Sequence, residues 1–191
     1  MIKGIIFDCF GVLTGDKWKE FVGSLPVDQQ EPARELNRAL DRGQLGLQDF
    51  SREIAGLTGR MPDRVEAIMQ AEMQKNEPLL GYIEQLKQHY KIGLLSNIAS
   101  DWIRTDFLNA AEQALFDDMI FSYRVGLVKP DGRIFELAAN RLDLNPGEIV
   151  FTDDSAMNCQ GAKKAGMNTI QYDNFANFRK QLDTLLGTGD S

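Results

Sequence analysis

Residues 4–13 read Gly4-Ile5-Ile6-Phe7-Asp8-Cys9-Phe10-Gly11-Val12-Leu13. The first four are apolar without polar alternation, which is typical of a strand buried on both faces of a parallel sheet. The turn after such a strand opens at the carboxyl edge of the sheet, where open α/β folds bind their ligands. Asp8 is therefore a candidate site residue, although an Asx turn at the strand end is the simpler explanation for one isolated Asp.

The composition is that of a globular protein and argues against several classes of partner. The chain has 191 residues, 43% of them hydrophobic and 26% charged, which is enough for one core plus a small appended domain. A formal net charge of −7 argues against a nucleic-acid or anionic-membrane surface. Cys9 and Cys159 lack metal-type spacing, so no disulfide framework or zinc site is expected. We expect a cytoplasmic protein without nucleic-acid or membrane partners, and the oligomeric state stays open.

Residues 16–74 predict helices and no strand. Apolar side chains recur there at spacings of three and four, and Gly43 and Gly59 interrupt the pattern. Four short helices of this kind form a compact bundle with its own small core. Inserted after the first strand, such a bundle is expected to act as a lid. The predicted helices span residues 16–25, 28–42, 47–57 and 62–75.

From residue 78 onward, helical segments alternate with short apolar segments. This alternation predicts parallel strands joined by right-handed crossovers. The expected fold class is therefore α/β, with a doubly wound parallel sheet. After the first strand, the predicted strands span residues 91–95, 119–122, 148–151 and 168–171, and the predicted helices 78–90, 101–116, 131–142, 157–165 and 175–186.

Most chemically reactive side chains directly follow the predicted strands. In a parallel sheet these positions all open at one edge, so residues distant in sequence converge on one crevice. The set combines carboxylates, a lysine, a hydroxyl and an amide. It comprises Asp8 after the first strand, Ser96 and Asn97 after the second, Lys129 in the loop after the third, and Asp153 and Asp154 after the fourth.

This set of side chains suits phosphoryl transfer through an aspartate. Carboxylates placed together repel one another unless a hard cation such as Mg²⁺ neutralises them, so Mg²⁺ is the expected cofactor. A carboxylate can attack phosphorus to form an aspartyl-phosphate, which water then hydrolyses. The developing charge requires donors, for which Lys129, Ser96, Asn97 and the backbone amides after Asp8 are candidates.

Four segments of the chain carry these side chains: residues 7–13, residues 94–97, residues 126–131 with Ile134 and Phe135, and residues 150–155 with Asn158, Ala162 and Gly166. In this order they resemble the nucleophile, phosphate-binding, lysine and acidic motifs of the haloacid dehalogenase-like (HAD) superfamily, the last in its paired-aspartate form. The likeness covers nearly the whole chain, and four motifs in the right order are far more specific than any single match. The segment between the first and second motifs resembles the helical type-1 cap of that family.

The resemblance implies a Rossmann-like core of residues 1–14 and 77–191, with an inserted helical-bundle cap of residues 15–76. It also implies an HAD-like hydrolase, most simply a phosphoric monoester hydrolase acting on a small phosphorylated metabolite. Asp8 becomes the nucleophile and a Mg²⁺ ligand, and Asp154 a direct ligand. Asp153 becomes either a second ligand or a residue that contacts the ligands without binding the metal itself. The backbone carbonyl of Phe10 faces the metal. The implied phosphate-binding residues are Ser96, Asn97 and Lys129, of which Lys129 is also catalytic.

Phe10 departs from the family pattern. Phosphatases of this family usually carry a second Asp two residues after the nucleophile as general acid and base, and a phenyl ring cannot move protons. Similar members with paired aspartates in the fourth motif lack that Asp and still look like phosphatases. The metal-independent 2-haloacid dehalogenases also resemble this chain at Phe10, but their fourth motif lacks the paired aspartates. Asp153 and Asp154 therefore favour the metal-dependent phosphatase, with a dehalogenase or a catalytically impaired phosphate-binding protein as alternatives.

The helical cap is expected to set substrate specificity, because a lid excludes water and contacts the substrate. Trp18, Phe21, Arg42 and Gln44 are candidates to face the crevice.

Overall fold

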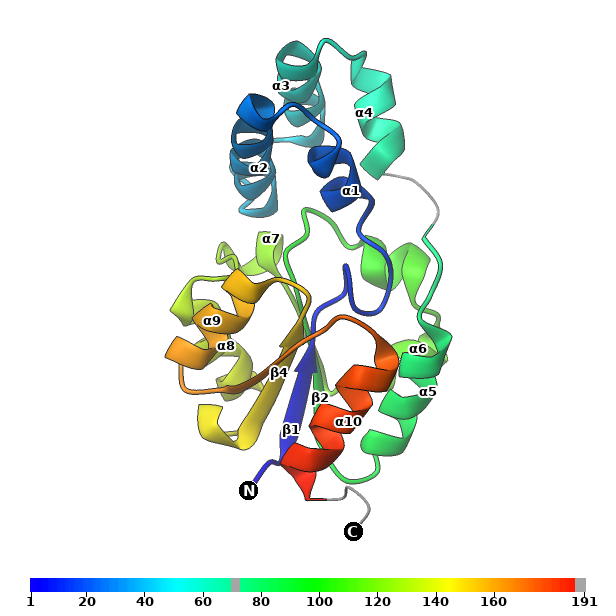
Figure 1. Cartoon of the computed structure of the whole chain (residues 1–191), viewed down its shortest axis with the longest axis vertical. Helices are drawn as coiled ribbons and strands as arrows, with labels where there is room; N and C mark the ends of the chain where they lie inside the picture. The colour runs from blue at the N-terminus through cyan, green and yellow to red at the C-terminus, as the bar shows by residue number, and fades with distance from the viewer. Residues whose placement is uncertain (70–72, 188–191) are drawn as a thin grey trace.

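The computed structural model describes residues 1–69 and 73–187, and its centre is a five-stranded parallel sheet (Figure 1). The strand order is β3-β2-β1-β4-β5, with β1 in the middle. Because helices cover both faces, the predicted doubly wound α/β fold is confirmed. The strands are β1 (Gly4–Phe7), β2 (Lys91–Ser96), β3 (Asp118–Phe121), β4 (Ile149–Asp153) and β5 (Asn168–Gln171).

The two faces of the sheet support two separate cores, because successive strand residues point to opposite faces. Ile5 and Phe7 pack under α5 (Glu77–Leu86) and α10 (Phe175–Leu186). Ile6, between them in sequence, packs on the other face under α8 and α9. Burial on both faces explains why β1 has no polar alternation. The helices of the second face are α8 (Gly132–Arg141) and α9 (Ala156–Lys164).

A third core lies among four helices above the carboxyl ends of the strands (Figure 1). Phe21, Phe50, Ile54 and Val65 are buried in it. The helices are α1 (Lys17–Gly23), α2 (Val27–Asp41), α3 (Leu47–Thr58) and α4 (Pro62–Met69). The helix predicted for residues 62–75 is too long, since residues 73 and 74 are not helical, while residues 70–72 lie outside the described part. The domain bounds 1–14 with 77–191 and 15–76 stay a prediction.

The chain enters and leaves this four-helix segment at nearly the same place. Thr14 and Lys75 form an isolated antiparallel bridge. The backbone N–H of Asn76 donates to the carbonyl of Leu13 at 2.8 Å. The Thr14 hydroxyl donates to the carbonyl of Gln74 at 2.9 Å. Backbone pairing therefore joins the first residues before the segment to the first residues after it.

The single helix predicted for residues 101–116 is wrong. The structure has a π-helical turn, η1 (Ile103–Phe107), and a short helix, α6 (Ala110–Gln113). Between them Leu108 is extended, and Asn109 forms a reciprocal capping box with Glu112. An Asn that caps a new helix competes with continuation of the old one.

The predicted loop before residue 131 also contains structure, because α7 (Ser122–Val125) follows β3 directly. A short 3₁₀ turn, η2 (Pro146–Glu148), precedes β4. In residues 1–69 and 73–187, no helix has both the length and the apolar character required to cross a membrane.

Candidate active site

The candidate site lies where the winding direction of the sheet reverses. The chain winds from β1 outward through β2 and β3, then returns to the other side of β1 with β4. In open α/β sheets the crevice at such a switch point binds the ligand. Asp8 directly follows β1 and Asp153 ends β4, so both carboxylates open into this crevice.

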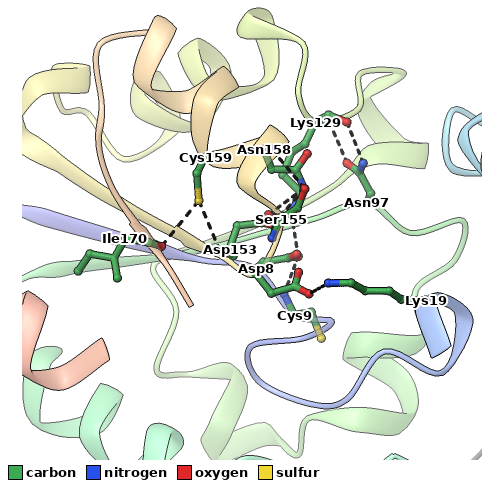
Figure 2. A network of polar contacts seen from close by, with 11 residues as sticks. Asp8, Cys9, Lys19, Asn97, Lys129, Asp153, Ser155, Asn158, Cys159 and Ile170 are labelled. Carbon is green, nitrogen blue, oxygen red and sulfur yellow. Dashed lines mark hydrogen bonds and ion pairs between the residues drawn. The ribbon is translucent and has the colours of Figure 1, made fainter. Parts of the chain in front are cut away.

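A buried lysine lies between these two carboxylates, as Figure 2 shows. The ammonium of Lys129 is 2.8 Å from Asp8 Oδ1 and 2.6 Å from Asp153 Oδ2, and Lys129 is only 2% exposed. Burial lowers the pKa of Lys129, but the two carboxylates outweigh burial and raise it, so the lysine is charged. The predicted meeting of Asp8, Lys129 and Asp153 at one edge is therefore found in the structure.

The two carboxyl groups beside Lys129 differ in their electrostatics. Burial raises the pKa of Asp8 well above its usual value, against the opposing charge of Lys129. For Asp153, burial also acts upward, but Lys129 and the N–H of Ser155, which donates at 2.8 Å, lower the pKa. The Asn158 amide adds contacts of 3.1 Å to both Asp153 oxygens. Hydrogen bonds and the Lys129 ammonium thus stabilise the ionised form of Asp153 at both of its oxygens, whereas the ionised form of Asp8 requires further positive charge.

Three carboxylates lie close enough together to bind one shared cation, and such a cation would supply that positive charge. One oxygen each from Asp8, Asp153 and Asp154 lies within 4.8 Å of the others. Carboxylate oxygens are the ligands that Mg²⁺ prefers, and one buried lysine does not balance three carboxylates. Gly11 leaves room for this arrangement, since a Cβ there would lie 2.5 Å from Asp154 Cγ, and its φ of +79° favours glycine. The donor set therefore fits a divalent cation.

A lysine of the four-helix segment also contacts this carboxylate group. Lys19 on α1 forms an ion pair with Asp154, and Figure 2 shows its side chain reaching toward the site from outside. Lys19 is mostly exposed, whereas the Asp154 side chain is mostly covered. The ammonium therefore neutralises an outer carboxylate of the site, opposite the buried Lys129.

Ser96 lies buried at the end of β2, and its hydroxyl has no hydrogen-bond partner among the described residues. The hydroxyl of Thr152 on β4 is also buried and unpartnered within that part of the chain. Buried hydroxyl groups are normally hydrogen-bonded, so an unpartnered one at a crevice is a candidate ligand group. The role of Ser96 in phosphate binding stays a prediction.

Asn97 and two backbone amides of the turn after Asp8, which were predicted to donate hydrogen bonds to phosphate, form hydrogen bonds within the protein instead. The Asn97 side chain accepts from the backbone N–H of Lys129 at 2.9 Å and donates to its carbonyl at 3.1 Å. Asn97 therefore fixes the backbone that carries the lysine. In the turn after Asp8, the N–H of Cys9 donates to Asp8 Oδ1 at 2.7 Å, and that of Gly11 donates to the Thr14 carbonyl at 2.8 Å. These amides shape the turn and orient Asp8.

The Phe10 side chain has a packing role. Its ring stacks on Trp102 with ring centres 6.0 Å apart, and Trp102 stacks in turn on Phe107. This contact explains an apolar residue two positions after Asp8. The approach of the Phe10 carbonyl to a metal stays a prediction.

Two of the four residues expected to face the crevice belong to the helical core instead. Trp18 packs against Phe21 and Phe50, with ring centres 5.1 and 5.2 Å away. Phe21 is buried. Aromatic residues at helical spacing more often build a core than a binding surface. Arg42 is half-buried and Gln44 exposed at the end of α2.

Two charged residues of the helical segment, Lys19 and Asp41, are not among the predicted site residues. Lys19 gives no signal in the sequence, because an exposed lysine in a first helical turn is ordinary. Asp41 does give one, because an acidic residue in the last turn of a helix opposes the helix dipole. It is the final residue of α2 and is buried.

Residues 2–166 match the sequence profile of the haloacid dehalogenase-like hydrolase family. Over nearly its whole length the chain is similar to a D-ribitol-5-phosphate phosphatase from Bacteroides thetaiotaomicron. The two are 26% identical, over 98% of this chain and 100% of that protein. It is also 28% identical to (S)-2-haloacid dehalogenase 1 from a Pseudomonas species, over 72% of this chain and 65% of the dehalogenase.

The fold is also similar to that of solved structures. One is an HAD family enzyme from Bacteroides thetaiotaomicron, crystallised in complex with magnesium and inorganic phosphate. It has a TM-score of 0.70 and 20% identity, and the match covers 93% of this chain and 99% of that one. At this identity the likeness bears on the fold.

Proposed function

Since the chain belongs to the haloacid dehalogenase-like hydrolase family, we propose that it is a Mg²⁺-dependent phosphatase of a small phosphorylated metabolite. The observation that carries this proposal is the group of three carboxylates, Asp8, Asp153 and Asp154, beside one buried lysine. Attack on carbon in a haloacid requires no such group. The phosphatase relative acts on a phosphorylated sugar alcohol, which favours a substrate of similar size.

In the proposed reaction Asp8 is the nucleophile and forms an aspartyl-phosphate, which water hydrolyses. The N–H of Cys9 and the ammonium of Lys129 both contact Asp8 Oδ1, so the other oxygen is the one directed to phosphorus. Lys129 stabilises the charge on the phosphoryl oxygens, and the Ser96 hydroxyl adds a donor.

Asp8 and Asp154 are the proposed Mg²⁺ ligands, with the carbonyl of Phe10. Asp153 is proposed to act behind them, because Lys129, Ser155 and Asn158 already engage its oxygens. Bound Mg²⁺ supplies charge neutralisation and a template for the phosphoryl group. The helices α1–α4, as the cap of residues 15–76, cover the crevice and select the substrate.

A panel of phosphomonoesters, including pentitol and sugar phosphates, tests the proposal with Mg²⁺ and with EDTA. We expect hydrolysis with Mg²⁺, loss of activity with EDTA, and loss in Asp8→Asn. Asp28→Asn, which changes an exposed carboxylate on α2, serves as the matched control and should retain activity. Metal-independent halide release from 2-haloacids would establish the dehalogenase instead. Phosphate binding without turnover of any ester would establish a binding protein.

A further inference from the structure

The proposed reaction requires a proton for the leaving group, and Phe10 cannot supply it. His89, the one histidine of the chain, is exposed just before β2 and therefore lies at the amino edge of the sheet, away from the crevice. The Cys9 thiol is fully buried, and burial raises its pKa well above the usual value. A carboxyl group outside the proposed metal ligands can carry such a proton.

Asp41 is a carboxyl group that the fold fixes at the crevice. It ends α2 and is 7% exposed. The hydroxyl of Ser122, itself fully buried after β3, donates to the carbonyl of Asp41 at 2.7 Å. The same Ser122 oxygen accepts from the N–H of Ile98, just after β2, at 2.9 Å. The end of α2 is therefore anchored directly to the carboxyl edge of the sheet.

The location of Asp41 contradicts local stability rules. A carboxylate in the last helical turn faces the negative end of the helix dipole, which disfavours its charge. Burial disfavours the charge further. Among the contacts the structure describes, the one side-chain hydrogen bond to the Asp41 carboxylate comes from the Asn37 amide, which donates to Oδ2 at 2.8 Å. Sites at which a chain breaks such rules tend to be functional.

Burial and the positive charges around Asp41 act in opposite directions on its pKa. Burial raises its pKa to about 7, the charge of Lys129 lowers it, and that of Asp16 raises it again. Arg42, next in the chain, acts downward. A general acid and base works best when its pKa lies near the working pH, since both of its forms are then populated.

We infer that Asp41, supplied by the helical segment, is the proton carrier of the phosphatase reaction, an inference that rests on the function proposed above. As Asp8 attacks phosphorus, the bond from phosphorus to the leaving oxygen breaks, and its electron pair stays on oxygen. Protonated Asp41 gives its proton to that oxygen, which releases the alcohol. Ionised Asp41 then takes a proton from the water that attacks the aspartyl-phosphate. The bond from phosphorus to the Asp8 oxygen breaks, its electron pair stays on the Asp8 carboxylate, phosphate is released, and Asp41 is protonated again.

Asp16 is the rival carboxyl group. It is half-buried at the N-cap of α1, where its Oδ1 accepts from the N–H of Lys19 at 2.8 Å. Burial raises the pKa of Asp16 too, but the N–H of Lys19 and the positive end of the helix dipole act against burial and favour the ionised form. Asp41 lies at the negative end of a helix, where the dipole and burial both favour a carboxyl group that can hold a proton.

The test compares Asp41→Asn with wild type on two esters in the presence of Mg²⁺. Asn keeps an oxygen that can accept from Asn37 but carries no transferable proton. An alkyl phosphate needs the proton, whereas p-nitrophenolate leaves without it. We therefore expect kcat/KM to fall roughly 10²- to 10⁴-fold for the alkyl ester and much less for p-nitrophenyl phosphate. With the latter, the variant should release a burst of p-nitrophenol, because hydrolysis of the phosphoenzyme also lacks its base.

Asp28→Asn on the same helix is the control, and circular dichroism and Mg²⁺ titration verify that each variant is folded. Equal losses on both esters, no loss on either, or the same leaving-group pattern in Asp16→Asn would overturn the inference. If wild type hydrolyses neither ester with Mg²⁺, the proposed function fails and the inference fails with it. A wild-type enzyme active on both esters, with Asp41→Asn unchanged, removes only the inference.

Discussion

Replacement of Lys129 by Met should destabilise the protein strongly and in a pH-dependent way. Met keeps the length of the side chain but leaves buried Asp8 and Asp153 without the ammonium that lies 2.8 and 2.6 Å away. Removal of one partner from a buried ion pair costs about 3–5 kcal/mol. For a chain of this size each kcal/mol shifts Tm by about 2–4 °C, so we expect Tm to fall by roughly 6–20 °C at pH 7.5.

The pH dependence follows from the carboxyl groups. In wild type the lowered pKa of Asp153 stabilises the fold above the unfolded pKa of about 3.9, and this contribution disappears as pH falls through the lowered value. In Lys129→Met, burial without the ammonium raises the pKa of both carboxyl groups. They become neutral as pH falls through those raised values, so the difference from wild type should shrink between pH 7.5 and pH 5.

Thermal and urea unfolding in EDTA at the two pH values measure this effect. Lys164→Met, on the exposed side of α9, is the matched control and should unfold like wild type. A Lys129→Met protein within about 1 kcal/mol of wild type at pH 7.5 would refute the reasoning, because that is below the cost of a broken buried pair. A difference that stays constant down to pH 5 would refute it too.

Three further predictions concern the ligand groups. Lys19→Met should tighten Mg²⁺ binding by about two- to fivefold in calorimetry, because an exposed ion pair worth up to about 1 kcal/mol no longer competes for Asp154; weaker binding contradicts this. Gly11→Ala should weaken Mg²⁺ binding by roughly tenfold or more in the same titration, since the added Cβ would lie 2.5 Å from Asp154 Cγ; an unchanged Kd excludes that clash. Ser96→Ala should lower phosphate affinity by about 10- to 100-fold without lowering Tm, because the lost hydroxyl has no partner in the described chain; a lower Tm with unchanged phosphate affinity reverses the interpretation.

The sheet was predictable because its signal is local and repeated. β1 and β5 have the predicted bounds, and the other strands differ by one or two residues at their ends. The break within residues 101–116 was not predictable from periodicity, since it depends on the cap that Asn109 forms with Glu112. Glu112 also pairs with Lys75 at 2.6 Å, a partner 37 positions away that no local pattern contains.

The convergence of Asp8, Lys129 and Asp153 was predictable because it follows from topology alone. The uses of neighbouring groups were not. Asn97 holds the Lys129 backbone, which depends on the shape of the loop after α7. The contributions of the helical segment through Asp41 and Lys19 depend on how α1 and α2 pack over the sheet, and spacing along the chain does not encode that packing.

The paired backbone at Thr14 and Lys75 has a consequence for how such proteins diversify. Because the four-helix segment begins and ends at nearly the same place, a segment of another length or fold could replace it there without altering any strand of the sheet. Asp8, Lys129, Asp153 and Asp154 belong to the sheet and the loops after its strands, whereas Asp41 and Lys19 belong to the four-helix segment. An exchange at this junction would therefore replace the proposed proton carrier together with the surface proposed to select the substrate.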